Sequence, residues 1–158
     1  MSASRVSGGK SARIFSGLGS LPHKWTTLPI VQGQESTGAN SLAVWGDIFS
    51  GDNIKAVVVG GDFSHDTVST QNSVLVELLP KLKFSQPKTP PHGYRSCVIY
   101  LSKNKLLTCG TSGSDISIDG GKNWTLISTE GFHVCQKAKK GKAVFLAGGG
   151  GRIAKLVE

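Results

Sequence analysis

Gly93-Tyr94-Arg95-Ser96-Cys97 is followed 38 residues later by Gly131-Phe132-His133-Val134-Cys135. Glycine, an aromatic residue, a basic residue and cysteine therefore recur in the same order. The same shift needs no gap further along the chain, where it pairs Gly110 with Gly148, Gly113 with Gly151, Ile118 with Leu156, and Leu107-Thr108-Cys109 with Phe145-Leu146-Ala147. Repetition at a period of about 20 to 50 residues is typical of chains that build one small structural unit several times.

A looser form of the repeat extends towards the N-terminus. An apolar segment ending in glycine occurs four times, and its glycines Gly8, Gly60, Gly110 and Gly148 are spaced by 52, 50 and 38 residues. Propeller blades repeat at about 40 to 50 residues. The chain also contains 21 Gly among 158 residues, which favours short strands joined by tight turns. The sequence predicts an all-β fold, a partial β-propeller of about three four-stranded antiparallel blades, with a β-sandwich as the alternative.

The repeat divides the chain into units of one partial propeller domain. Residues 1–30 form part of a blade, 38–87 and 93–129 form blades, and 131–158 form a three-stranded last blade. No helix is predicted. The predicted strands are the end of a strand near Val6–Gly9, then Arg13–Phe15, Trp25–Leu28, Ser41–Trp45, Lys55–Val59, Val74–Leu78, Lys83–Gln86, Ser96–Leu101, Lys105–Cys109, Asp115–Ile118, Trp124–Ser128, Val134–Lys137, Ala143–Ala147 and Ile153–Val157.

The most specific motif is Ser117-Ile118-Asp119-Gly120-Gly121-Lys122-Asn123-Trp124, which fits S-x-D-x-G-x-x-W, the Asp-box. The Asp119 carboxylate can accept hydrogen bonds from backbone N–H groups of a turn. Gly121 tolerates positive φ, and Trp124 can pack on the sheet. Ser117, Asp119, Gly121 and Trp124 are therefore predicted to be structural. Two weaker copies precede Trp25, at residues 17–20, and Phe84, at residues 79–81.

These segments, with Pro90–Cys97, Phe145–Gly149, Val31–Gly33 and Thr37–Ser41, resemble the Asp-box (BNR-type) propellers related to photosystem II assembly and stability factors. The resemblance extends to bacterial relatives that are often labelled oxidoreductases. It covers nearly the whole chain but about half of a full propeller of that family. The resemblance implies a six- or seven-bladed ring, often with an export signal, so blades upstream of Met1 are expected to be missing. Two chains that combine into a closed ring are the alternative.

Several functional classes are disfavoured by composition. No G-x-G-x-x-G set lies in a βαβ context, so no cofactor is predicted. Cys97, Cys109 and Cys135 are an odd number without C-x-x-C spacing, which disfavours a disulfide framework or a metal site and leaves buried apolar thiols or a reactive thiol. No segment is long enough to span a membrane. The absence of an apolar core near Met1 indicates a cytoplasmic chain as given, whereas the resemblance implies export.

The net charge of +8 has its densest cluster at Lys137, Lys139, Lys140 and Lys142, around a predicted turn. Basic residues that bind nucleic acid are usually interleaved with aromatic ones, and these are not. The cluster therefore predicts a solvated turn, with non-specific anion binding as the alternative. Nucleic acid is an unlikely partner by this criterion.

In a propeller, the loops between blades and those between second and third strands share one face, near the central channel. Loops on a rigid scaffold commonly carry function. The candidate binding face comprises Asp62, His65, His92, Tyr94, Arg95, Asp115, His133 and Arg152. Ordinary solvated loops are the alternative interpretation.

No catalytic residue is predicted. A sialidase-like hydrolase needs an arginine cluster with a Tyr–Glu pair and an acid, and only Arg5, Arg13, Arg95 and Arg152 are present. We therefore predict a non-catalytic binding or scaffolding module for an unknown protein or glycan. A sialidase-like or other Asp-box propeller enzyme, including the oxidoreductase label of relatives, is the alternative.

Overall fold

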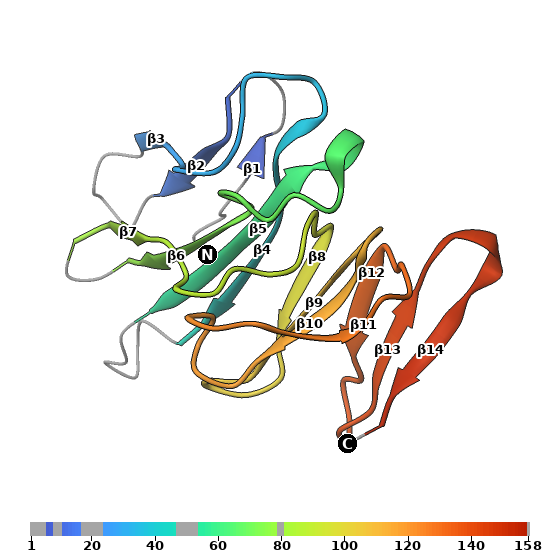
Figure 1. Ribbon diagram of the computed structural model, residues 1–158. Coiled ribbons are helices and arrows are strands. Elements are labelled where there is room, and N and C mark those ends of the chain that lie inside the picture. Colours follow the sequence, from blue (N-terminus) through green and yellow to red (C-terminus); the bar gives the residue numbers. More distant parts are fainter. Residues whose placement is uncertain (1–5, 8–10, 17–23, 47–53, 79–80, 158) are drawn as a thin grey trace.

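The computed structural model describes residues 6–7, 11–16, 24–46, 54–78 and 81–157. These residues form four antiparallel sheets that follow one another along the chain (Figure 1). Two sheets have four strands and two have three described strands. The first sheet contains β1 (Val6–Ser7), β2 (Arg13–Ser16) and β3 (Lys24–Thr27), and the second contains β4 (Thr37–Trp45), β5 (Lys55–Asp62), β6 (Ser73–Glu77) and β7 (Lys83–Ser85). The third sheet contains β8 (Cys97–Tyr100), β9 (Leu106–Gly110), β10 (Gly113–Ser117) and β11 (Thr125–Ser128). The fourth sheet contains β12 (Val134–Lys137), β13 (Val144–Ala147) and β14 (Ile153–Leu156).

The all-β prediction is confirmed, and the four open sheets have the arrangement of a partial propeller. In the described residues, helical structure is limited to two three-residue 3₁₀ turns, η1 (Phe63–His65) and η2 (Gly149–Gly151), which the sequence did not predict. No helix within the described ranges is long and apolar enough to cross a membrane.

The second sheet is longer than predicted. β4 begins at Thr37 rather than Ser41, and β5 continues to Asp62 rather than ending at Val59. The extra paired residues lie beyond a register shift in the β4–β5 pairing, between Ala39 and Ser41. The two strands can lie this close because position 60 is glycine, since a Cβ on Gly60 would overlap the carbonyl oxygen of Gly38.

Apolar side chains from neighbouring sheets fill three cores. Ile14, Leu28 and Val58 belong to the core between the first and second sheets. Val57, Leu106 and Trp124 lie between the second and third. Leu107 and Leu146 lie between the third and fourth. Adjacent residues such as Leu106 and Leu107 belong to different cores because successive side chains of a strand point to opposite faces.

The structural repeat differs from the gap-free sequence repeat by one residue on the first strand of the third and fourth sheets. We call these first strands, β8 and β12, the inner strands. The Ser96 N–H donates to the Cys109 carbonyl, and the His133 N–H donates to the Ala147 carbonyl, both at 2.8 Å. Cys109 and Ala147 are 38 residues apart, but Ser96 and His133 are 37 apart. The gap-free alignment is therefore wrong there. Arg95 corresponds to Phe132, because their N–H groups donate to the equivalent glycine carbonyls of Gly60 and Gly110.

The repeated glycine at or near the end of the second strand has a steric role in the third and fourth sheets. A Cβ on Gly110 would overlap the Tyr94 carbonyl oxygen, and a Cβ on Gly148 would lie 2.8 Å from that of Gly131. Both positions therefore need glycine, because the segment that leads into the inner strand passes directly against the second strand there. The matching Gly8 lies outside the described residues.

Candidate functional site

The loops that follow β5, β9 and β13 lie at the same edge of the sheets, at the top of Figure 1. The inner strands β8 and β12 begin at this edge, so the segments that enter them lie beside those loops. All eight residues of the candidate binding face lie in or next to these segments. They differ greatly, however, in exposure and in what they contact.

Arg95 and Asp115 are fully buried and form an ion pair. The Arg95 Nε donates to Asp115 Oδ2 at 2.7 Å, and Nη2 lies against the same oxygen. The remaining nitrogen, Nη1, donates to the Tyr94 carbonyl at 2.8 Å and to the Ser112 hydroxyl at 2.9 Å. The guanidinium is therefore surrounded by partners from its own chain.

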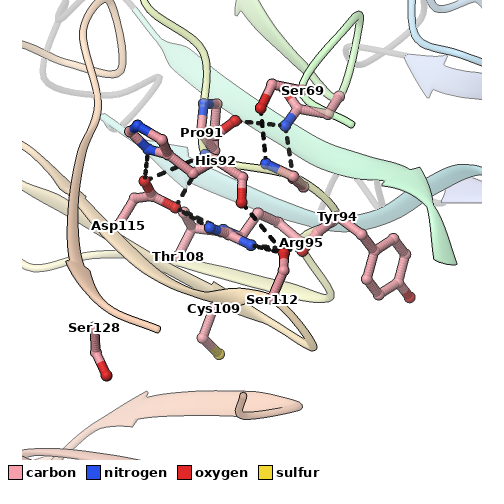
Figure 2. Close-up of polar contacts among 12 residues, drawn as sticks. Ser69, Pro91, His92, Tyr94, Arg95, Thr108, Cys109, Ser112, Asp115 and Ser128 are labelled. Carbon is pink, nitrogen blue, oxygen red and sulfur yellow. Dashed lines mark hydrogen bonds and ion pairs between the residues drawn. The ribbon is translucent and has the colours of Figure 1, made fainter. Parts of the chain in front are cut away.

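His92 completes this cluster from the solvent side. Its ring Nδ1 lies 2.6 Å from Asp115 Oδ1, and its backbone N–H lies 3.3 Å from both carboxylate oxygens. The side chain of His92 is half exposed, whereas that of Asp115 is buried. Figure 2 shows the imidazole and the guanidinium on opposite sides of the carboxylate. The carboxylate thus ties the segment before β8 to β10.

The same segment is also held by the loop between β5 and β6. The buried Asn72 amide donates to the carbonyls of Pro91, at 2.8 Å, and Gly93, at 2.6 Å. The Gly93 N–H donates to the Ser69 hydroxyl at 2.9 Å. The Tyr94 N–H donates to the Asp66 carbonyl at 2.8 Å. Contacts from both the second and third sheets therefore fix residues 91–95.

On this support, aromatic side chains lie towards solvent. The ring of Phe63, 57% exposed, meets the half-buried ring of Tyr94 edge-on, with 6.3 Å between centroids. Figure 2 shows the Tyr94 ring directed away from the Arg95–Asp115 pair. Partial burial raises the pKa of Tyr94. The phenol is consequently a neutral hydrogen-bonding group beside an exposed apolar ring.

Asp62 is the last residue of β5 and caps the η1 turn, which ends at His65. Asp62 Oδ2 lies 2.8 Å from His65 Nδ1, and Asp62 Oδ1 accepts a hydrogen bond from the Ser64 N–H at 2.9 Å. Hydrogen bonds from His65, and next from Ser36, lower the pKa of Asp62 to about 2. The two residues also line a hollow of about 320 Å³, together with Val31, Gln34, Val68, Thr70 and Gln71.

His133 and Arg152 are exposed at the fourth sheet. Arg152 Nη1 lies 3.3 Å from Glu130 Oε2, with both side chains more than half exposed. The His133 ring lies near Gly149 of the β13–β14 loop. Within the described residues, no hydrogen bond or ion pair connects either side chain to the Arg95–Asp115 cluster.

The Asp-box turn lies between β10 and β11, at the opposite edge of the third sheet. Asp119 Oδ1 accepts hydrogen bonds from the N–H groups of Lys122 and Asn123, both at 3.0 Å. Gly121 has φ +90°, and Trp124 is buried between the second and third sheets. The Gly121 N–H also donates to the Ser117 hydroxyl at 2.9 Å, and a structural role for these four residues stays a prediction. The weaker copy at residues 17–20 lies outside the described residues, as does most of that at 79–81.

Sequence reasoning missed the burial of Arg95 and Asp115, and it missed Phe63, Asn72 and Ser112. A signal for the ion pair was present. Asp115 is the only charged residue in a strand that otherwise contains Gly, Ser and Ile, and a charge on a buried strand is normally paired. Phe63 follows Asp62 directly, but nothing in the sequence distinguishes an exposed phenylalanine from a buried one.

In the lysine cluster, Lys137 is the last residue of β12, and Lys139, Lys140 and Lys142 are exposed in the β12–β13 loop. Lys137 Nζ donates to the Leu101 carbonyl at 2.8 Å.

Among the described residues, no group of three or more His, Cys, Asp or Glu could hold a metal ion. In comparisons with known proteins, no family model matches the chain and no curated protein matches it significantly.

Proposed function

We propose that the chain is a non-catalytic binding module that contacts a protein partner through the loop surface, defined as Phe63, His65, His92, Tyr94, His133 and Arg152. The observation that carries this proposal is the contact between exposed Phe63 and half-buried Tyr94, on loops that buried hydrogen bonds hold in place. Aromatic residues with fixed positions and low entropy on ordering are frequent anchors of protein interfaces.

A protein fits this surface better than a glycan. Phe63 and Val68 are exposed apolar side chains in one loop, and exposed apolar groups near polar ones are typical of protein contacts. The hollow beside Asp62 and His65 has room for a side chain of the partner. A glycan ligand remains an outcome of the test described below.

Arg95 and Asp115 support the binding module rather than an enzyme. A sialidase-like site would need the guanidinium to face a substrate carboxylate, but that of Arg95 is buried and paired. The proposed role of both residues is to hold the loop surface in place. The resemblance to Asp-box propellers of the photosystem-assembly-factor type is likewise a proposal, supported by the hydrogen bonds of Asp119.

Self-association is proposed as a further property of the fold. Val134, Phe145 and Ile153 are exposed on the face of the fourth sheet that points away from the third. Their counterparts in the third sheet are Cys97, Leu107 and Ser114, which lie on the face that the fourth sheet covers. Light scattering should detect a dimer, and a monomer at all concentrations would remove this proposal.

The binding proposal is tested by immobilising three forms of the chain separately: the wild type, a loop-surface variant and a matched control. The loop-surface variant carries Phe63→Ala, Tyr94→Ala, His133→Ala and Arg152→Ala. The matched control carries Ile118→Ser and Lys122→Ala, which are exposed at the opposite edge. Wild type and control should capture the same partner and the loop-surface variant should lose it, with unchanged melting temperatures. Equal capture by all three would refute the proposed surface, and binding to a glycan array alone would refute the protein partner.

A further inference from the structure

The three cysteines of the chain meet at the junction of the third and fourth sheets. Cys97 lies on β8, Cys109 lies directly opposite it on β9, and Cys135 lies on the neighbouring inner strand β12. All three are reduced. The sequence repeat aligned Cys97 with Cys135, but the one-residue offset in the structure turns their side chains towards each other rather than to equivalent faces.

The closest approach is between Cys97 and Cys135. Their sulfur atoms lie 3.6 Å apart, and the Cys135 N–H points at Cys97 Sγ at 3.4 Å. Cys97 is partly exposed, whereas Cys109 and Cys135 are buried at 0% and 2% exposure. A reagent from solvent therefore reaches Cys97 first and finds a second thiol in van der Waals contact with it.

The surroundings also favour deprotonation of Cys97. Hydrogen bonds from Cys109, and then from Cys135, lower the pKa of Cys97. Hydrogen bonding with Cys109 and with Cys97, together with burial, raises the pKa of the Cys135 thiol. The thiolate is the reactive form of cysteine. The direction of this pKa shift agrees with the geometry, in which Cys97 is the accessible sulfur.

We propose that Cys97 and Cys135 form an oxidisable dithiol site that reacts with a small hydroperoxide and links the third sheet to the fourth through a disulfide. In the first step the Cys97 thiolate attacks one oxygen of the hydroperoxide. The O–O bond breaks, sulfenic acid forms at Cys97, and the other oxygen leaves as water or alcohol after protonation. In the second step the Cys135 sulfur attacks the Cys97 sulfur, the S–O bond breaks, and water leaves with the thiol proton. The hydroperoxide is reduced, and the two thiols are oxidised.

Cys135 is the partner in this reaction because its sulfur already contacts that of Cys97. Formation of the bond requires the sulfurs to move from 3.6 Å to about 2 Å apart. The link would join two strands that belong to different sheets, 38 residues apart in sequence. A cross-link over such a loop should raise the melting temperature of the oxidised chain, because it constrains the unfolded state.

Peptide mapping of the wild-type chain and of two cysteine variants tests this proposal. Trypsin cleavage after Arg95, Lys103, Lys105, Lys122 and Lys137 separates the cysteines into peptides 96–103, 106–122 and 123–137. After native protein is treated with hydrogen peroxide and remaining thiols are blocked, we expect peptide 96–103 joined to 123–137, loss of two of three free thiols, and reversal by dithiothreitol. Cys109→Ser should still form the link, whereas Cys135→Ser should stop at sulfenic acid, trapped by dimedone.

Three results would overturn the proposal. The first is a native protein that keeps three thiols under peroxide while a denatured sample oxidises, which would mean that the cysteines are only buried apolar side chains. The second is a link between peptides 96–103 and 106–122. The third is a link that forms only between different chains, seen as a dimer on a non-reducing gel.

Discussion

Arg95 and Asp115 form a fully buried ion pair that joins the entry of β8 to β10, and the fourth sheet has Phe132 and Ala154 in the corresponding positions. The charged pair and the apolar pair occupy equivalent places. This exchange shows that the fold itself does not require a charge there. In the third sheet the pair also holds His92, and through it the segment that carries Tyr94.

Removing one charge of this pair should be far more damaging than replacing both. Asp115→Ala leaves the guanidinium buried without a counter-charge, which typically costs about 3 to 5 kcal/mol. The double variant Arg95→Phe/Asp115→Ala copies the fourth sheet and should recover at least half of that loss. Urea unfolding measures both. Equal destabilisation by the single and double variants would contradict the role of the ion pair.

The Asp-box carboxylate should stabilise the β10–β11 turn. Asp119→Ala removes acceptors for two backbone N–H groups and for the Asn123 amide. The expected loss is about 1 to 3 kcal/mol, as for hydrogen bonds to a charged group. Asp66→Ala is the control, because within the described ranges its carboxylate has no hydrogen bond. A loss no larger than that of the control would show that the turn does not need the carboxylate.

The contribution of Asp119 should also depend on pH. Burial raises its pKa, but the hydrogen bonds from Asn123, Ser117 and Lys122 outweigh burial and lower it below 3.8. The contribution is therefore fully present above about pH 4 and is lost as pH falls through the folded-state pKa. The difference in unfolding free energy between wild type and Asp119→Ala should therefore shrink as pH falls from 5 to 2. A constant difference over this range would count against ionisation as the cause.

The repeated glycine should be intolerant of a methyl group. Gly110→Ala places a Cβ against the Tyr94 carbonyl and the Arg95 Cα, so the inner strand must move. Overpacking of this kind costs about 1 to 3 kcal/mol. Gly149→Ala is a matched control, since its Cβ would have only an ordinary 3.6 Å contact with His133. Thermal unfolding should separate the two, and equal melting temperatures would refute the steric role.

The sequence predicted the strands well where a turn residue and alternation agreed. β12 lies at the predicted Val134–Lys137, and residues 118–124 join β10 to β11 where the sequence predicted a turn. The register of the inner strands could not be predicted, because Gly-aromatic-basic-Cys matches without a gap while the backbone bonds differ by one residue. The burial of Arg95 followed from that register and from the position of Asp115 on another strand. Such pairings depend on contacts distant in sequence, which no local pattern encodes.

The most direct test of the proposed loop surface is a titration of ¹⁵N-labelled chain with the captured partner, followed by amide chemical shifts. The largest shifts should fall on Phe63 to Asp66, Gly93 to Tyr94 and Glu130 to His133, while Ser117 to Trp124 at the opposite edge should not move. Shifts confined to the Asp-box turn or to the loop at Lys137–Lys142, with the loop surface unchanged, would contradict the account.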